Sequence, residues 1–359
     1  MELFFDLVFV FSVTQLVSLL HHSFTWYGAG QAALAFWMIW WAWTQFTRTL
    51  NAANTGHHLV EMGTLIATAV AFFMAVALPG AFSGGAMAFA VPYVLVRVMG
   101  LTLYAWVASE KPSLRGAIQT FALASIGGLV AVLAGGLAGG ATLYWLWGLA
   151  ILFDIIAAAV GGQSEGWDIH PEHFSERHGL FVIIALGETL IVAGSGLTGS
   201  DWTRDLIGVA ILAVAITCGL WWTYFPLSKP ALEHALASCR GSAQSTMARD
   251  AFSLVHFLMV CGIIAYAAAI EEMAAHPSQP LGLEGRLALA AGLVLFVGGM
   301  AAALLRCGCR PPLPRIVLTA ATACAVVTVT GVPPLATLAI SLAGIVAIAV
   351  HEQRLAPAA

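Results

Sequence analysis

Residues 4–20 read FFDLVFVFSVTQLVSLL, and residues 178–197 read HGLFVIIALGETLIVAGSGL. Both stretches are almost entirely apolar, and each approaches the roughly 20 residues that a helix needs to cross a bilayer. Similar apolar segments follow one another along the whole chain, with short breaks between them. Alternating segments of about ten residues, which are typical of membrane strands, are absent from the sequence. The sequence therefore predicts an all-α fold, a polytopic transmembrane helical bundle.

The apolar segments give a count of about twelve spans. Twelve spans of about 20 residues would occupy roughly 240 of the 359 residues, which leaves only short loops. The predicted spans are Phe4–Leu20, Gln31–Leu50, Leu59–Leu78, Gly84–Val107, Arg115–Ala138, Ala141–Val160, His178–Leu197, Leu206–Pro226, Ala251–Met273, Leu287–Leu305, Ile316–Thr330 and Pro334–His351.

The composition excludes several classes of protein. Charged residues make up 9% of the chain, against roughly 25% in a soluble domain. Hydrophobic residues make up 60%, against about 45–50% in soluble chains. So few charges cannot cover the surface of a soluble protein of this length, which argues against a soluble enzyme, a nucleic-acid binder and a disordered protein. The net charge of −4 is too small to indicate a charged partner.

The 14 basic residues test the orientation of the spans. If the N-terminus is cytoplasmic, only Arg204 and Arg286 fall on the opposite side, and Arg97 lies within a span. Such a bias follows the positive-inside rule, so we expect both termini to be cytoplasmic. The basic residues expected on the cytoplasmic side are Arg48, Lys111, Arg115, Arg177, Lys229, Arg240, Arg249, Arg306, Arg310, Arg315 and Arg354.

The two halves of the chain resemble each other around an acidic midpoint that contains Glu165 and Asp168. An offset of 174 residues superposes Glu2 on Glu176 and residues 14–16 (TQL) on residues 188–190 (ETL). We therefore predict two parallel six-helix transmembrane repeats, residues 1–165 and 166–359, related by an axis along the membrane normal. Chance similarity between apolar segments is the alternative.

Ionisable groups at membrane depth usually mark function, because they are costly in hydrocarbon. Glu2 and Asp6 lie four residues apart, on one face of the first predicted helix. Together with Thr14 and Gln15 they indicate a helix that lines a polar path. The alternative is that both carboxylates only favour a helix N-terminus, where the helix dipole stabilises anions.

Arg97 needs a carboxylate or a wet cavity, because an unpaired guanidinium is costly inside the membrane. The candidate partners are Asp6, Asp154 and Glu188. A structural ion pair that fixes the register of two helices is an equally good explanation of Arg97.

The first predicted span of the second half carries a further polar set. Glu188 and Thr189 follow Gly187, and Thr189 shares a helix face with His178. A membrane-embedded glutamate near a histidine suits a proton-coupled carrier. His256 lies in the middle of another span, where a lone histidine is more often a hydrogen-bonded core residue.

Cofactor chemistry has little support in the sequence. The cysteines lie in spans or on the predicted cytoplasmic side, which indicates reduced thiols. We find no nucleotide-binding loop, nucleophile elbow or HExxH motif, and expect no catalytic residue, no metal site and no cofactor. The tryptophans at 40, 41, 43, 221 and 222 are typical of interfacial anchors, with a binding site as the alternative.

These residues resemble the low temperature requirement A (LtrA) family of bacterial membrane proteins. The resemblance is carried by residues 2–11 (ELFFDLVFVF), residues 173–189 (HFSERHGLFVIIALGET), Arg97, Asp154 and residues 221–225 (WWTYF), and it covers nearly the whole chain. It implies a multi-pass protein of the bacterial cell (inner) membrane. The family name reflects growth in the cold, so the resemblance supplies no molecular activity.

We expect an ion or small-solute transport or permeation protein, not an enzyme, with a polar path between the two repeats. Its partners would be the lipid bilayer and a small ion or solute, with no nucleic acid, and an oligomer is compatible with the sequence. The alternatives are a membrane-embedded cofactor-binding enzyme and a non-catalytic membrane component in cold or stress adaptation. The residues expected in the path or its buried polar network are Glu2, Asp6, Thr14, Gln15, Arg97, Asp154, Glu176, His178, Glu188, Thr189 and His256.

Overall fold

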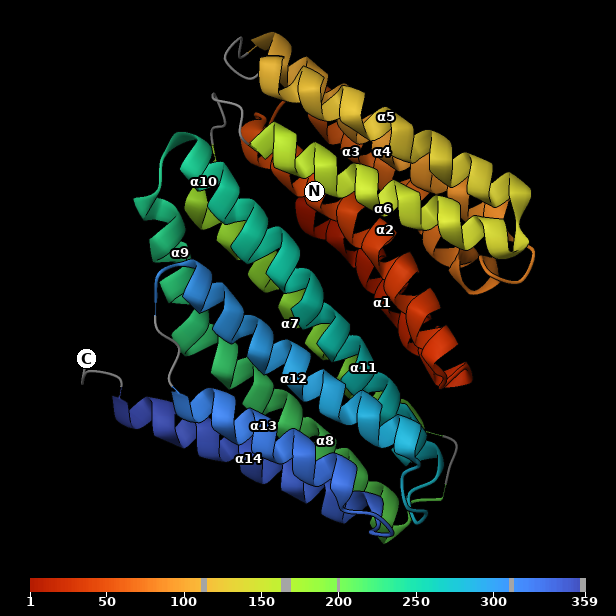
Figure 1. Ribbon diagram of the computed structural model, residues 1–359, viewed down its shortest axis with the longest axis vertical. Helices are drawn as coiled ribbons and strands as arrows, with labels where there is room; N and C mark the ends of the chain where they lie inside the picture. Colours follow the sequence, from red (N-terminus) through yellow and green to blue (C-terminus); the bar gives the residue numbers. More distant parts are fainter. Residues whose placement is uncertain (111–114, 163–168, 199–200, 310–312, 356–359) are drawn as a thin grey trace. The chain divides into compact units, whose positions relative to one another are not determined.

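A computed structural model describes residues 1–110, 115–162, 169–198, 201–309 and 313–355 (Figure 1). The described residues form helices joined by short turns, with no strand among them. Lys111, Glu165, Asp168 and Arg310, which the sequence analysis used, lie outside these ranges. The predicted all-α fold is confirmed.

The described residues of the first half of the chain form six long helices. They are α1 (Glu2–His22), α2 (Trp26–Ala52), α3 (His58–Ala77), α4 (Ala86–Glu110), α5 (Arg115–Ala138) and α6 (Gly140–Gly162), with a short 3₁₀ turn η1 (Leu78–Gly80) after α3.

The described residues of the second half also form six long helices, with shorter segments between α8 and α11. The long helices are α7 (Pro171–Leu197), α8 (Arg204–Thr223), α11 (Val255–Ala275), α12 (Leu283–Arg306), α13 (Leu313–Thr328) and α14 (Pro334–Leu355). The shorter segments are η3 (Tyr224–Ser228), α9 (Lys229–Ser238), α10 (Gly241–Met247) and η4 (Ala248–Leu254).

Each of the twelve predicted spans falls on one of these long helices. Ten helical segments of the described chain are long and apolar enough to cross a membrane. The other two predicted spans correspond to α2 and α13. Helix α2 has 27 residues, but polar side chains such as Gln45, Arg48 and Asn51 make its sequence less apolar. Helix α13 has only 16 residues. The protein is therefore a polytopic helical membrane protein in which α2 and α13 are the least typical spans.

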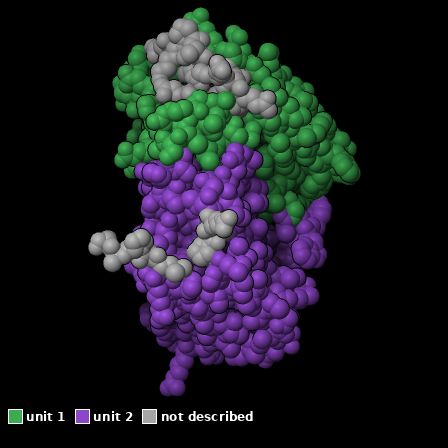
Figure 2. Space-filling model, turned by 60° about the vertical axis from the view of Figure 1, so that its left-hand side comes forward, with its two compact units in different colours: residues 1–16, 30–177, 236–249 green, residues 17–29, 178–235, 250–359 purple. Residues whose placement is uncertain are grey.

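The described chain forms two compact units, coloured in Figure 2. Unit 1 comprises Met1–Leu16, Gly30–Arg177 and Leu236–Arg249. In this unit α3 packs on α4, α4 on α5, and α5 on α6. Unit 2 comprises Val17–Ala29, His178–Ala235 and Asp250–Ala359.

In unit 2, α11 packs on α12, α12 on α13, and α13 on α14, which also packs on α8. Helices α1 and α7 each have residues in both units. The predicted repeats, with a boundary at residue 165, stay a prediction.

Helix α2 contributes buried aromatic side chains to unit 1. Trp40, Trp41 and Trp43 are at most 4% exposed, and Trp40 lies 4.9 Å from Trp43 between ring centroids. The interpretation of this cluster as interfacial anchors was therefore wrong, because these rings pack against protein. Trp221 and Trp222 on α8 are 38% and 41% exposed, as anchors at an interface would be.

Two π-helical segments, η3 and η4, interrupt the chain between α8 and α11. Pro226 lies inside η3, where it has no N–H to donate and its ring would clash with the carbonyl of a normal helical turn. The wider π turn relieves this clash, and such turns occur frequently at functional sites.

Candidate functional site

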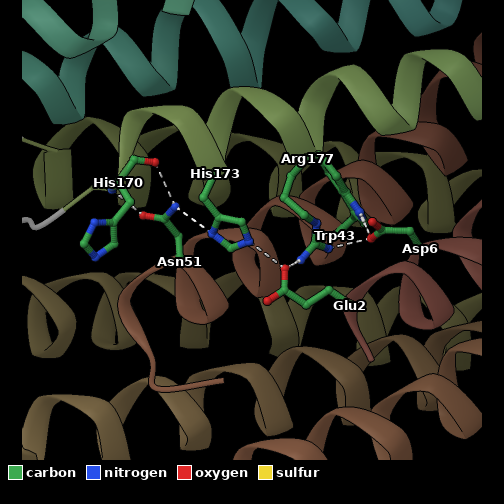
Figure 3. A network of polar contacts seen from close by, with 7 residues as sticks. All are labelled: Glu2, Asp6, Trp43, Asn51, His170, His173 and Arg177. Atoms are coloured by element: carbon green, nitrogen blue, oxygen red, sulfur yellow. Dashed lines mark hydrogen bonds and ion pairs between the residues drawn. The ribbon is translucent and has the colours of Figure 1, made fainter. Parts of the chain in front are cut away.

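The most highly charged buried site of the described chain lies in unit 1, where α1 meets the first turns of α7 (Figure 3). Arg177 donates through Nη1 to Glu2 Oε2 and through Nη2 to Asp6 Oδ1, the latter at 2.6 Å. Glu2 and Asp6 are one helical turn apart, so a single guanidinium reaches both carboxylates. The predicted shared face of Glu2 and Asp6 therefore exists, and a basic residue from α7 lies against it.

Trp43 on α2 closes the buried end of this site. Its Nε1 donates to Asp6 Oδ1 at 2.7 Å, and the Arg177 guanidinium lies 6.0 Å from its ring centroid. Asp6 is fully buried and Arg177 is 2% exposed. The second carboxylate oxygen of Asp6, Oδ2, is also buried and has no hydrogen-bond partner among the described residues.

A chain of hydrogen bonds leads from Glu2 toward the surface. His173 Nε2 lies 2.9 Å from Glu2 Oε2, and Asn51 Nδ2 donates to His173 Nδ1 at 3.2 Å. Asn51 is fixed by His170, which donates its N–H to Asn51 Oδ1 and accepts from Asn51 Nδ2 at its carbonyl. Because the amide donates to Nδ1, a neutral His173 carries its proton on Nε2. This N–H then donates a hydrogen bond to Glu2.

We call Glu2, Asp6, Trp43, Asn51, His170, His173 and Arg177 the Arg177 network. It holds two carboxylates and one guanidinium, so it is one positive charge short of neutrality while its histidines are neutral. The His173 side chain is 35% exposed and the Glu2 side chain is 15% exposed. A proton or a small cation would balance the charge of this network.

Arg97 lies in a second buried cluster of unit 1, and here the charges match. Its Nη1 donates to Asp154 Oδ1 at 3.0 Å and to Tyr93 Oη at 2.7 Å, and its Nε donates to Gln45 Oε1. Of the three carboxylates considered as partners, Asp154 is the one paired with Arg97. One guanidinium meets one carboxylate, and polar side chains satisfy its remaining donors, which is the arrangement of a structural ion pair.

His178 and His256 come together in unit 2, next to the π segments. Their ring centroids are 5.4 Å apart, and both residues are fully buried. His256 Nδ1 lies 2.9 Å from the carbonyl oxygen of Ala251, and Tyr224 Oη lies 2.8 Å from His256 Nε2. A carbonyl only accepts hydrogen bonds, so a neutral His256 carries its proton on Nδ1. Its Nε2 then accepts a hydrogen bond from the Tyr224 hydroxyl.

Thr189 belongs to a ladder of hydroxyl groups in unit 2. It donates to the carbonyl of Leu186 at 2.6 Å and lies 2.7 Å from Thr217 Oγ1. Tyr266 and Thr217 both donate to the carbonyl of Ala213. Glu188 is 1% exposed, so α7 buries a carboxylate directly beside this ladder.

The remaining predicted residues contribute less. Thr14 and Gln15 are partly buried on α1. Glu176 is exposed, so it is not part of a buried polar network, and its neighbour Arg177 lies in that network instead. No group of three His, Cys, Asp or Glu side chains in the described ranges is arranged to hold a metal ion.

Sequence reasoning missed Arg177, His173, Asn51 and Trp43 as site residues. Arg177 counted only as a loop cation, although its spacing of four residues from His173 places both on one helix face. It also missed Arg315, which is 2% exposed and forms a bidentate pair with Glu352. Arg315 is held further by Ser228 and by the carbonyl of Thr223, at the ends of η3.

The chain matches a known protein family over nearly its whole length. The family model for bacterial low temperature requirement A protein (LtrA) matches residues 1–350. The chain belongs to the LtrA family. An LtrA relative, the "Uncharacterized protein RA0937" of Rhizobium meliloti (strain 1021), is 31% identical over 312 residues, which cover 83% of this chain and 75% of the relative. No solved structure matches the chain.

Membership in the LtrA family agrees with the predicted resemblance and with the helical membrane architecture. The matched region includes all seven residues of the Arg177 network and both residues of the Arg97–Asp154 pair.

Proposed function

We propose that this LtrA protein moves an ion or a small solute across the membrane, and that the Arg177 network binds the proton or cation involved. The observation that carries the proposal is the charge imbalance around Asp6. Two carboxylates share one buried guanidinium, and Asp6 Oδ2 is buried without a hydrogen-bond partner in the described chain. Burying such an excess charge is costly unless a counter-charge arrives.

The Arg97–Asp154 pair shows what a purely structural arrangement looks like in the same unit. There each charge has one opposite charge, and the guanidinium also donates to Tyr93 and Gln45. The Arg177 network lacks this match. His173 adds a group that can gain a proton, is hydrogen-bonded to Glu2 and is partly exposed to solvent. These features support a proton-responsive or cation-responsive site.

The distribution of basic residues supports a cytoplasmic position for the network. Glu2 and Asp6 lie in the first turns of α1, and in the orientation favoured by the positive-inside rule this end faces the cytoplasm. We accordingly place the protein in the bacterial cell membrane with both termini inside. The network would then bind its proton or cation from the cytoplasmic side.

The test is flux into liposomes that contain the purified protein and an entrapped dye selective for the ion offered, with H⁺, Na⁺ and K⁺ offered in turn under an imposed membrane potential. We expect flux above protein-free liposomes for at least one of these ions. Asp6→Asn should reduce that flux at least tenfold, because the excess negative charge disappears while an oxygen remains for Trp43 and Arg177. The matched control is Glu61→Gln, a carboxylate in the first turn of α3 whose side chain is 46% exposed.

The proposal that the Arg177 network binds a transported proton or cation would be overturned if none of the three ions crossed faster than in protein-free liposomes, or if Asp6→Asn and the parent gave equal flux. Thermal unfolding of each variant in detergent would show whether a loss of flux reflects misfolding.

A non-catalytic membrane component is the second candidate. It is favoured by the ion pairs Arg97–Asp154 and Arg315–Glu352, which are buried and matched one to one. This candidate predicts no flux, and it predicts that the buried charges affect only stability. A membrane-embedded cofactor enzyme would instead be indicated by visible absorbance or stoichiometric metal in the purified protein.

A further inference from the structure

A second group of ionisable side chains lies at the other end of α1, within unit 2. His21, in the last turn of α1, lies between two consecutive glutamates of α11. His21 Nε2 is 3.1 Å from Glu272 Oε2, and His21 Nδ1 is 3.3 Å from Glu271 Oε1. The three side chains are between 20% and 35% exposed, so the group lies near solvent.

The protonation of this group follows from its geometry. A neutral imidazole has one N–H, which His21 can donate to Glu272 through Nε2. Its Nδ1 lone pair then faces the Glu271 carboxylate, and two acceptors at this distance repel each other. His21 Nδ1 is buried and makes no well-aligned hydrogen bond to any described residue. A second proton on the imidazole removes the repulsion and makes both contacts attractive.

The surroundings of His21 carry negative charge. Helix α1 ends at His22, and α11 ends four residues after Glu271. The C-terminal end of a helix carries partial negative charge, which disfavours carboxylates and stabilises cations. The described titratable groups in contact with His21 are Glu271 and Glu272 from α11 and His22 from α1, whose ring centroid is 5.8 Å away.

We propose that His21, Glu271 and Glu272 form a proton-binding site, the His21 latch, which holds the end of α1 against α11 when it is protonated. Both contacts are attractive while the imidazole carries two protons, and the contact with Glu271 becomes repulsive when the imidazole carries one. The segment Val17–Ala29, which contains the latch histidine, then loosens. This proposal does not depend on the proposed function, because the latch is a proton site whether or not the protein transports anything.

The test is hydrogen–deuterium exchange of the purified full-length protein in detergent at acidic and alkaline pH, with the rates corrected for the intrinsic effect of pH on amide exchange. In the parent protein, amides of residues 17–29 should exchange at least fivefold faster at the alkaline pH. His21→Ala should give fast exchange at both pH values, because the bridge is absent.

Glu271→Gln should have the opposite effect. Its side-chain amide can donate to the Nδ1 lone pair of neutral His21, so the contact survives without the extra proton and exchange should stay slow at both pH values. His22→Gln is the matched control: His22 contacts its own helix at the Ser18 carbonyl, and the variant should keep the pH dependence of the parent.

Equal protection of residues 17–29 at both pH values in the parent would overturn the latch. So would loss of the pH dependence in His22→Gln, or a pH dependence that persists unchanged in Glu271→Gln.

Discussion

Arg177 Nη2 lies 2.6 Å from Asp6 Oδ1, and both side chains are at most 3% exposed. The two residues are 171 positions apart in the sequence, so this contact fixes α1 against the start of α7. The same guanidinium also donates a hydrogen bond to Glu2, so Asp6 shares its cation with a second carboxylate. The site therefore holds two carboxylates for one guanidinium, unlike the matched pair Arg97–Asp154.

Removing the guanidinium should destabilise the protein more than removing one carboxylate. Arg177→Met leaves buried Asp6 without a cation, and breaking a buried pair in this way costs about 3–5 kcal/mol. We expect the double variant Arg177→Met with Asp6→Asn to recover a large part of this loss, because no unpaired charge remains at Asp6. Thermal unfolding in detergent measures both effects. Equal melting temperatures for Arg177→Met and the parent would contradict this account of the site.

The Arg97–Asp154 pair should affect stability in the same way, but it should not affect ion flux. Asp154→Leu leaves the Arg97 guanidinium buried without its carboxylate, and the expected cost is again about 3–5 kcal/mol. Arg97→Met with Asp154→Leu together should restore most of the stability, since a buried matched pair adds little net stability over apolar packing. Because one guanidinium meets one carboxylate here, our proposal predicts that the double variant retains the ion flux of the parent. Loss of flux in a stably folded double variant would assign the pair a direct role in the path.

The sequence was sufficient to predict the helices, but it did not single out the partner of Arg97. Long apolar runs predicted the spans because a bilayer requires them, and the cost of an unpaired charge limited the partners of Arg97 to three carboxylates. The choice among the three required the fold. Helices in a membrane are apolar on lipid-facing and protein-facing sides alike, so the periodicity of α4 does not tell which neighbour it faces.

Glu2 and Asp6 were predicted as site residues, but Arg177, which pairs with both, was missed for a related reason. Arg177 and Arg315 lie just outside apolar runs, so they counted as loop cations in the charge tally. Both are in fact buried, because α7 begins at Pro171 and α13 begins at Leu313, before the first residues of the predicted spans. A cation at a predicted boundary is buried only if a neighbouring helix covers it, and the sequence gives no measure of that covering.

The crossing of α11 and α12 should tolerate no side chain at Gly262. A Cβ atom there would lie 2.8 Å from the carbonyl oxygen of Gly292 and 2.8 Å from the backbone nitrogen of Phe296, both parts of α12. Backbone atoms cannot move aside as a flexible side chain can, so Gly262→Ala should destabilise unit 2 by about 1–3 kcal/mol. Gly298→Ala is the control, because its Cβ would meet nothing within 4 Å. Comparable melting temperatures for the two variants would show that the helices can separate without cost.

The orientation in the membrane can be checked by the access of a membrane-impermeant maleimide to cysteines in intact cells. The positive-inside rule places the end of α12, with Cys307 and Cys309, on the cytoplasmic side, and the connection between α11 and α12 on the outside. The native cysteines should therefore stay unlabelled until the cells are opened. Ser278→Cys, at an exposed position of that connection, should be labelled in intact cells. The reverse pattern would place both termini outside, and the Arg177 network would then take its proton from the external solution, which is the other side of the membrane from the one we propose.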